Sequence, residues 1–479
     1  MPIPKEILAV ERPKNTVVIA YGKNKDRYAV RERLGCSYDN GRRLPKNGSI
    51  IGHIINNKYV PKENGNLDVS QSQIDLKDWG SIVLADTLAS TLLNELETVY
   101  SRDDALKIYC IAILRVCNPG IKDYELKDSY EQSFLSELYP CVALSKNTVS
   151  DFWGDLGKAY SRIVSFMKIR VSTVEKGHHI LVDGTLKSNE SKINTLSDFS
   201  RKARTKGTRD ISLLYAYDLE EQEPICSKCF PGNMPDSVSY KEFISENNIS
   251  KGILIGDKGF PSSTINDILG ENDDLHYLNP LKRDSRYIKK YNLYEFEGQV
   301  PGYENILYKR AKVANKEKWL YCFRDIKQAH REEYGWLHKT KNGNSYDNEK
   351  YKEDSQSFGT ILLESDCDME PLVAYRAYSS RWEIELVMRY YKQACQFDET
   401  RVHKDYSVIG SEFCNFISTI ITYRFIKKFD RTSLLLKMTY KKILSILQRA
   451  KKVRADGKEW KLIKMNPSQL EILQLLGLI

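Results

Sequence analysis

The sequence lacks any apolar run long enough to cross a membrane, which takes about 18 to 20 uninterrupted apolar residues. The longest candidate, residues 413–425, is interrupted by Asn415 and Arg424. The N-terminal residues MPIPKEILAVERPK also lack the apolar stretch and small-residue cleavage site of a secretory signal. We therefore expect a cytoplasmic protein and exclude membrane and secreted classes.

Cysteine is sparse and unpatterned, because the ten cysteines in 479 residues show no spacing typical of a disulfide framework. One CxxC occurs, at Cys226 and Cys229, and no second CxxC completes a structural zinc site. We interpret these two residues as ordinary strand cysteines.

The composition favours a globular, multidomain protein. Hydrophobic residues make up 41% of the chain, so wholesale disorder is excluded, and the length suggests about two to four domains. Lys plus Arg is 73 against 64 Asp plus Glu, a net charge of +9, and there are 30 tyrosines. This balance is compatible with a nucleic acid partner, although many basic proteins bind nothing acidic.

The chain divides into four regions by local pattern. We expect a basic, β-rich region at 1–65, a helical DNA-binding region at 66–176, a catalytic core at 177–430 and a helical, basic tail at 431–479. In the second region, Ser145 or Asn147 is expected to cap a short helix. The order of strands and helices in the core predicts an α/β fold with a mixed sheet.

The elements of the core can be placed by residue number. Five strands are expected, at 178–183, 211–217, 224–230, 252–255 and 276–281. A β-rich insertion follows at about 285–355 and ends in a polar loop at 340–356. Strand character resumes at 358–363. Helices are expected at 237–247, 262–269, 371–395, 406–428 and 434–454.

Three acidic residues stand out by position. Asp183 lies in or at the end of the apolar strand ILVDGT, Asp257 ends a second such strand in ILIGDKGF, and Glu385 lies on the long helix. A carboxylate in an apolar strand is unfavourable unless it is paired or binds a cation. Carboxylates from two strands and one helix suit a hard divalent metal ion, although each acid alone is also explained as a turn residue.

The helix around Glu385 carries an unusual set of side chains. Tyr378, Arg381, Glu385 and Lys392 follow the spacing Y-x₂-R-x₃-E-x₆-K. At about 100° per residue, a continuous helix places all four within about 40° of Glu385, and Arg389 joins the same face. An ordinary solvated stripe of i,i+4 charges is the alternative interpretation.

Together these motifs resemble those of the DDE transposases of bacterial insertion sequences, in the large group like insertion sequence 4. The spacing of the helix matches the Y-x₂-R-x₃-E-x₆-K signature of that family without gaps. Its D-x-T stretch matches 183–185, its D-[RK]-G-[FY] stretch matches 257–260, and its G-N-x-x-D stretch matches 232–236. The resemblance is strong over about 177–430.

The resemblance implies a ribonuclease-H-like core interrupted by the β-rich insertion. It also implies two Mg²⁺ ions, with Mn²⁺ as a substitute, bridged by Asp183 and completed by Asp257 and Glu385. The implied reaction is cleavage at the ends of the element, followed by joining of the 3′-OH ends to target DNA. No protein nucleophile is needed, so the absence of a Ser-His-Asp arrangement carries no weight.

The implied partner is double-stranded DNA, as terminal inverted repeats and as target, bound by a homodimer in a synaptic complex at the bacterial nucleoid. Tyr378, Arg381 and Lys392 would hold the transposon end. The further DNA-facing candidates are Arg389, Lys258, Arg204 and Lys206. Two alternatives stay open, namely a metal-dependent nuclease without strand transfer and a domesticated DNA-binding protein.

Overall fold

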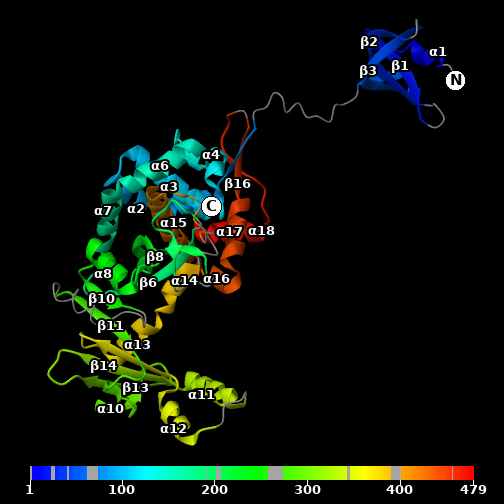
Figure 1. Cartoon of the computed structure of the whole chain (residues 1–479). Helices are drawn as coiled ribbons and strands as arrows, with labels where there is room; N and C mark the ends of the chain where they lie inside the picture. The colour runs from blue at the N-terminus through cyan, green and yellow to red at the C-terminus, as the bar shows by residue number, and fades with distance from the viewer. Residues whose placement is uncertain are drawn as a thin grey trace. The chain divides into compact units, whose positions relative to one another are not determined.

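The computed structural model describes residues 3–22, 27–39, 42–61, 74–189, 191–200, 207–256, 273–341, 346–389, 397, 400, 402–455 and 457–479. The chain forms two compact units (Figure 1). The first comprises Met1–Asp75 and Arg454–Trp460, and the second comprises Leu76–Val453 and Lys461–Ile479. Asp183 and Glu385 both lie in the second unit.

The first unit is built on a four-stranded antiparallel sheet in the order β1-β2-β3-β4. Its elements are α1 (Lys5–Leu8), β1 (Thr16–Tyr21), β2 (Arg27–Asp39), β3 (Arg42–Ile55) and β4 (Lys58–Pro61). Strand β1 covers the β-branched residues at 16–19, within the region expected to be β-rich. Val18, Val30 and Ile54 form a small buried cluster of their own, which gives the sheet one apolar face.

The second unit begins with a group of helices. They are α2 (Gly80–Glu97), α3 (Arg102–Cys117), the 3-10 turn η1 (Asp123–Glu125), α4 (Leu126–Glu131), α5 (Leu135–Leu138), α6 (Lys146–Lys158) and α7 (Tyr160–Ser172). Ser145 caps α6 by accepting a hydrogen bond from the Thr148 N–H at 3.3 Å, as its sequence indicates. Helices α2, α3 and α6 pack against α15 (Asp405–Arg431), whose inner residues are almost all buried.

A mixed sheet forms the centre of the second unit, so the expected α/β class is confirmed. Its strands lie in the order β12 (Gly298–Gln299), β13 (Ile306–Lys312), β14 (Trp319–Asp325), β15 (Thr360–Ser365), β11, β10, β6, β8 and β7, with β9 paired to β8. Strand β6 (His179–Ser188) lies between β10 (Gly252–Ile255), which is parallel to it, and β8 (Arg209–Asp218), which is antiparallel. The remaining core strands are β7 (Asp198–Phe199), β9 (Glu223–Pro231) and β11 (Leu275–Leu281).

The first core strand is longer than its apolar run suggests. The sequence places its end at Asp183, but β6 continues to Ser188 because residues beyond Asp183 still pair with β8, as far as Ser188 with Asp210. Asp183 therefore sits in mid-strand. The expected helix at 237–247 is α8 (Asp236–Glu246), whereas the one at 262–269 falls outside the described residues.

The insertion extends the core sheet rather than standing apart from it. Strand β15 (Thr360–Ser365) pairs antiparallel with both β11 and β14 (Trp319–Asp325). The other elements are α10 (Tyr287–Lys290), β12 (Gly298–Gln299), β13 (Ile306–Lys312), α11 (Ile326–Lys341) and α12 (Asn348–Ser357). A separate apolar cluster that includes Leu293 and Leu320 lies under these strands.

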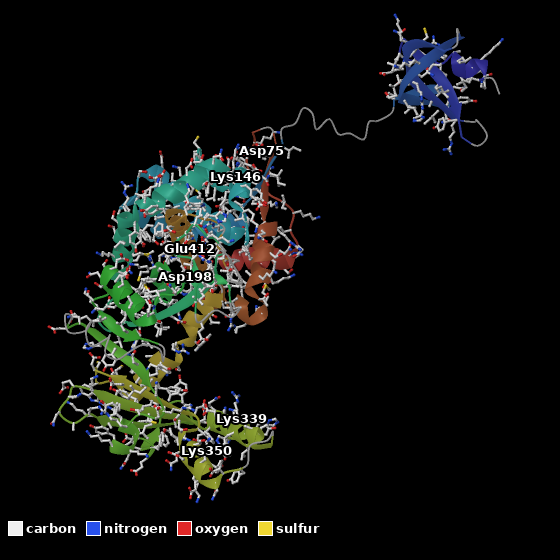
Figure 2. All side chains as sticks on the ribbon, viewed as in Figure 1. Asp75, Lys146, Asp198, Lys339, Lys350 and Glu412 are labelled. Carbon is white, nitrogen blue, oxygen red and sulfur yellow. The ribbon has the colours of Figure 1, made fainter. Side chains whose placement is uncertain are left out.

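The prediction of a polar loop at 340–356 is wrong, because most of the described residues in this segment are helical. Asp347 caps α12 by accepting hydrogen bonds from two backbone N–H groups, and Trp336 of α11 packs against Tyr351 of α12 with ring centroids 5.3 Å apart. A good cap and one aromatic contact thus stabilise a helix with no apolar face. Lys339 and Lys350 mark the two helices in Figure 2.

The amphipathic pattern predicts one helix over 434–454, and this prediction is wrong. The tail forms α16 (Leu434–Lys437), α17 (Tyr440–Arg449), β16 (Lys451–Ala455), β17 (Lys461–Leu462) and α18 (Pro467–Leu476). Thr439 caps α17 and so starts a new helix, while β16 pairs in a three-stranded sheet ordered β17-β16-β5, where β5 is Ile74–Asp78. No described helix combines the length and hydropathy that a membrane crossing requires.

Candidate catalytic site

Asp183 lies on the central strand at the point where burial gives way to exposure. The three residues before it are buried, Asp183 itself is partly exposed, and Gly184 is exposed. One carboxylate oxygen, Oδ1, accepts a hydrogen bond from the Gly184 N–H at 2.8 Å. The apolar run therefore anchors the strand in the core and presents this carboxylate at the edge of the buried region.

Strand β10 leads toward the second acid. Ile255, its last residue, pairs with Leu181 in parallel register. Asp183 follows Leu181 by two residues, and in the sequence Asp257 likewise follows Ile255 by two. Asp257 and Lys258 lie outside the described residues, so the structure places the strand that precedes them and not the side chains.

Glu385 lies on α14 (Trp382–Arg389), which packs directly against β6. Segments about 200 residues apart in sequence thus meet, and the helix of Glu385 lies beside the strand of Asp183. The carboxylate of Glu385 is about half exposed and forms an ion pair with Arg381, with 3.0 Å between Oε1 and Nη2. Arg389, at the end of the same helix, is exposed.

The continuous helix expected at 371–395 is wrong, because the chain breaks between α13 (Pro371–Ser379) and α14. The Ser379 hydroxyl donates to the Arg376 carbonyl, and the Arg381 N–H donates to Tyr378 at i−3 rather than i−4. Hydroxyl side chains compete for backbone groups in this way and weaken a helix. Tyr378 and Glu385 thus lie on separate helices, and Tyr378 packs against the main core.

Several of the other sequence-predicted residues cannot be placed. Lys392, Arg204 and Lys206, like Asp257 and Lys258, lie outside the described residues. The residues that the structure does place are Asp183, Tyr378, Arg381, Glu385 and Arg389. Of these, it joins Arg381 to Glu385 through the ion pair and brings the helix of Glu385 against the strand of Asp183.

The G-N-x-x-D stretch has a local structural explanation. Gly232 lies where a Cβ atom would overlap the backbone oxygens of Asp198 and Asp210, so a larger residue does not fit without movement. The next residue, Asn233, donates from Nδ2 to Asp198 Oδ2 at 2.7 Å (Figure 2 labels Asp198). The first two positions of the stretch therefore hold the turn after β9 against the segment around β7.

The donor chemistry of the described acids suits a hard divalent cation. Asp183 and Glu385 both offer carboxylate oxygens, the ligand type that Mg²⁺ prefers. Both side chains are accessible to solvent, so an ion can reach them. An ion bound by Glu385 would compete with the Arg381 guanidinium, because Glu385 forms an ion pair with Arg381.

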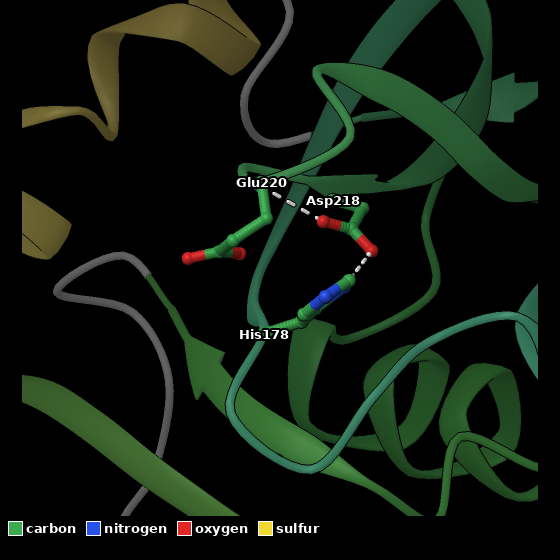
Figure 3. Close-up of side chains that lie close together, drawn as sticks. All are labelled: His178, Asp218 and Glu220. Atoms are coloured by element: carbon green, nitrogen blue, oxygen red, sulfur yellow. Dashed lines mark hydrogen bonds and ion pairs between the residues drawn. The ribbon is translucent and has the colours of Figure 1, made fainter.

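A second polar cluster lies at the opposite end of the central strand and was not anticipated. Figure 3 shows His178, Asp218 and Glu220, whose potential ligand atoms lie within 4.8 Å of one another. His178 Nδ1 is 2.7 Å from Asp218 Oδ2, and Asp218 Oδ1 accepts the Glu220 N–H at 3.0 Å. The partners are 40 residues apart in sequence, so no local signal could have found them.

The hydrogen bonds in this cluster account for its pKa values. Burial disfavours the charged imidazole of His178, but the hydrogen bond to Asp218 and the charge of that carboxylate outweigh burial and raise its pKa. Burial alone would raise the pKa of Glu220, but its contacts with His179 lower it. Five residues of strand, about 16 Å, separate His178 from Asp183, so this cluster is distinct from the candidate site.

The two cysteines of the CxxC lie on strand β9, as the sequence interpretation has it. Cys226 is buried and Cys229 is partly buried, and both are free thiols. Burial raises the pKa of each thiol well above its ordinary value, which disfavours the thiolate that binds metal. Neither residue belongs to the metal-type cluster found among the described residues.

Comparison with known proteins gives one family match. The family model described as "Transposase DDE domain" matches residues 175–408, a segment that contains Asp183, Asp257 and Glu385. Among solved structures, the chain is similar to a cryo-EM structure of the piggyBac transposase synaptic complex with hairpin DNA. The TM-score is 0.38 at 11% identity, covering 79% of this chain and 82% of that one. No curated protein matches the chain.

Proposed function

We propose that this protein is a DDE transposase that cleaves DNA at the ends of an insertion sequence and joins the 3′-OH ends to target DNA, and the family match over residues 175–408 supports this proposal. Within that family, the insertion-sequence-4-like group is the assignment we favour, because the Y-x₂-R-x₃-E-x₆-K spacing is complete in the sequence. The proposed substrates are the terminal inverted repeats of the element and a double-stranded target.

One observation carries the proposal, namely the packing of α14 against β6. It brings the helix of Glu385 beside the strand of Asp183, although the two residues are far apart in sequence. On another edge of β6, the parallel strand β10 leads to Asp257 with the same two-residue offset from the last paired residue. A mixed sheet with the acid-bearing strand at its centre supports a ribonuclease-H-like core.

We propose that Asp183, Asp257 and Glu385 together hold two divalent metal ions, Mg²⁺ being the preferred species. When bound, such ions supply activation of the attacking oxygen and stabilisation of the leaving oxygen in phosphoryl transfer. The rigid strand fixes the carboxylate of Asp183 at the edge of the buried core. Arg381 holds the Glu385 side chain through its ion pair before any ion is bound.

The cationic side chains near the acids are proposed to position the DNA backbone. Arg381 lies in the turn just before α14 and Arg389 lies at the end of α14, and both are at least partly exposed, so they can reach phosphate oxygens. Lys392 and Tyr378 are proposed to contribute as the family signature suggests. Because two element ends must be paired for strand transfer, we propose that the protein acts as a homodimer on DNA.

The test is a cleavage and strand-transfer assay with Mg²⁺ or Mn²⁺ on duplexes that carry the element ends. We expect Asp183→Asn, Asp257→Asn and Glu385→Gln each to abolish both steps, because each substitution removes a carboxylate that holds metal. Asp155→Asn is the matched control, since Asp155 is an exposed acid on α6 that forms an ion pair with Lys158.

The products distinguish the competing functions. Cleavage without joined product would replace the transposase proposal with a nuclease. Full activity in any one of the three variants would remove that residue from the site. DNA binding without any cleavage by the wild-type protein would favour a domesticated DNA-binding protein.

A further inference from the structure

A cavity of about 310 Å³ lies between the helical group and the central strand, and neither Asp183 nor Glu385 lines it. Its walls come from α3, η1, α6, α15 and β6, and it also contacts Phe397 and Thr400. The volume is at the lower end of the range typical of small-ligand sites, about 300 to 1,000 Å³. A space of this size accepts a group no larger than about one nucleotide.

The floor of the cavity is charged and almost fully buried. Lys187 of β6 forms an ion pair with Glu412 of α15, with 2.5 Å between Nζ and Oε1. Arg115 of α3 donates to Asn415 Oδ1 at 2.7 Å and to Asp123 Oδ1 at 3.1 Å. Buried groups held by several partners in this way form a rigid, preorganised polar surface.

The rim adds cations and an aromatic ring that face solvent. Lys146, at the start of α6, is exposed, and Lys122 is partly exposed (Figure 2 labels Lys146 and Glu412). Neither lysine forms an ion pair with a described residue. Tyr124 of η1 lines the same cavity and is 60% exposed, so its ring is available for stacking.

Cations outnumber acids around the cavity. The described lining residues with charged side chains are Arg115, Lys122, Lys146, Lys187, Asp123 and Glu412. Trp153 and Phe397 add aromatic surface, and the Arg115 guanidinium lies 4.9 Å from the Trp153 ring centroid. Excess positive charge beside aromatic rings is the chemistry that binds a phosphate together with a planar base.

One buried polar atom of the lining has no hydrogen-bond partner among the described residues. The Thr400 hydroxyl oxygen is buried and has no hydrogen-bond partner in the described part of the chain. Such groups in proteins are nearly always satisfied by protein, water or ligand. A ligand group in the cavity would satisfy it.

One residue that lines the cavity, Lys187, lies on the same strand as the candidate catalytic residue Asp183. Lys187 follows Asp183 by four residues on β6, and side chains four apart in a strand point to the same face. At about 3.3 Å per residue the two positions are about 13 Å apart. That separation corresponds to about four nucleotides of one DNA strand at 3.4 Å per nucleotide.

We propose that this cavity binds one nucleotide unit of a DNA strand that also passes the catalytic acids, with its phosphate at Lys122 and Lys146 and its base against Tyr124. The inference rests on the proposed function for the source of the nucleotide. The chemistry of the cavity, a phosphate and an aromatic ring, is independent of that function. Free deoxynucleotide is therefore the second source that the test must separate.

Tyr124 offers the sharpest test, because Tyr124→Ala removes the ring and Tyr124→Phe keeps it. We expect Tyr124→Ala to weaken binding of a duplex with a single-stranded tail about 5- to 150-fold, the range given by stacking of one base. Tyr124→Phe should bind like the wild type, and a blunt duplex should respond less than the tailed one. Because the Tyr124 side chain is exposed, neither substitution disturbs the core, and circular dichroism checks that both variants fold.

The lysines give an independent measurement. The double variant Lys122→Ala, Lys146→Ala should lower the slope of log affinity against log salt by about 2 on the tailed duplex, one for each phosphate-binding lysine. Lys158→Ala is the matched control, since Lys158 lies on α6 with Lys146 but does not line the cavity. A calorimetric titration with deoxythymidine monophosphate tests whether the protein binds the free nucleotide.

The outcomes separate this inference from the proposed function. Equal binding by Tyr124→Ala and Tyr124→Phe on every probe, or no binding of any probe by the wild type, overturns the nucleotide cavity. Binding of the monophosphate without tailed DNA overturns the DNA strand as source. If the wild-type protein does not cleave DNA but the Tyr124 and lysine variants change binding as expected, the proposed reaction is overturned. The nucleotide-binding cavity is then still supported.

Discussion

The buried ion pair between Lys187 and Glu412 yields the most quantitative prediction for this protein. Their side chains are 2% and 5% exposed, and Glu412 Oε1 also accepts a hydrogen bond from Asn415 at 3.2 Å. Burial lowers the pKa of Lys187 although Glu412 opposes the shift, which shows how strongly the site disfavours an uncompensated charge. Glu412→Gln removes the carboxylate that faces this buried ammonium and should destabilise the fold by about 3 to 5 kcal/mol.

The expected change in melting temperature follows from the size of the unit. For a unit of about 400 residues, an unfolding entropy of about 2.1 cal/mol/K per residue amounts to about 0.8 kcal/mol/K. Glu412→Gln should therefore lower the melting temperature by about 4 to 6 °C. Replacing both partners, as Lys187→Met with Glu412→Leu, should recover most of this loss because neither charge of the pair is then left buried without the other.

The assay is differential scanning calorimetry of the single and double variants at neutral pH. Asp155→Asn is the matched control, because it breaks an ion pair with Lys158 whose side chains are 73% and 64% exposed and should change the melting temperature by about 1 °C or less. A shift for Glu412→Gln no larger than that of the control would refute the argument, since it would mean that water reaches the pair.

Three further predictions concern other parts of the second unit. The pKa of His178 is raised in the fold, so its stabilisation is fully present below about pH 6.5 and is lost as pH rises through the folded pKa. His178→Gln should therefore lower the melting temperature more at pH 5.5 than at pH 8.5. An equal loss at both pH values would contradict the charge pairing with Asp218. Gly359 has a φ of +69° and no room for a Cβ atom, whereas Gly335 lies within α11 with open space around it. In urea denaturation, Gly359→Ala should lower the free energy of unfolding by more than about 1 kcal/mol, and Gly335→Ala should raise it by about 0.5 to 1 kcal/mol. Arg381→Ala removes a partly exposed ion pair to Glu385 and should change stability by less than about 1 kcal/mol while weakening DNA binding in a filter assay, so unchanged binding would remove it from the DNA face.

Much of the core could be predicted from short sequence patterns. Strand β10 and the expected strands at 211–217, 224–230 and 276–281 were each found to within about two residues of their observed ends, because buried apolar runs report strands directly. The cap of α6 by Ser145 is equally local. Asp183 stood out because it interrupts such a run.

The candidate site could be predicted only in part. The motif around Glu385 was visible in the sequence, but the shared helix face was not correct, since hydrogen bonding by Ser379 and the tightened turn at Arg381 break the helix. A periodicity argument assumes an unbroken helix and cannot detect where hydroxyl groups compete with the backbone. The cluster of His178 and Asp218 could not be predicted from the sequence for another reason, because the two residues meet through strand pairing.

By itself, the sequence determined the local elements, the spacing of the acids and the charge balance, since each depends on neighbours a few residues apart. Only the tertiary structure decided that α14 packs on β6, that the insertion strands join the core sheet through β15, and that Lys187 and Glu412 close the floor of a cavity. These features join segments separated by tens to hundreds of residues. Their free energy comes from burial and pairing between distant elements, which no local pattern encodes.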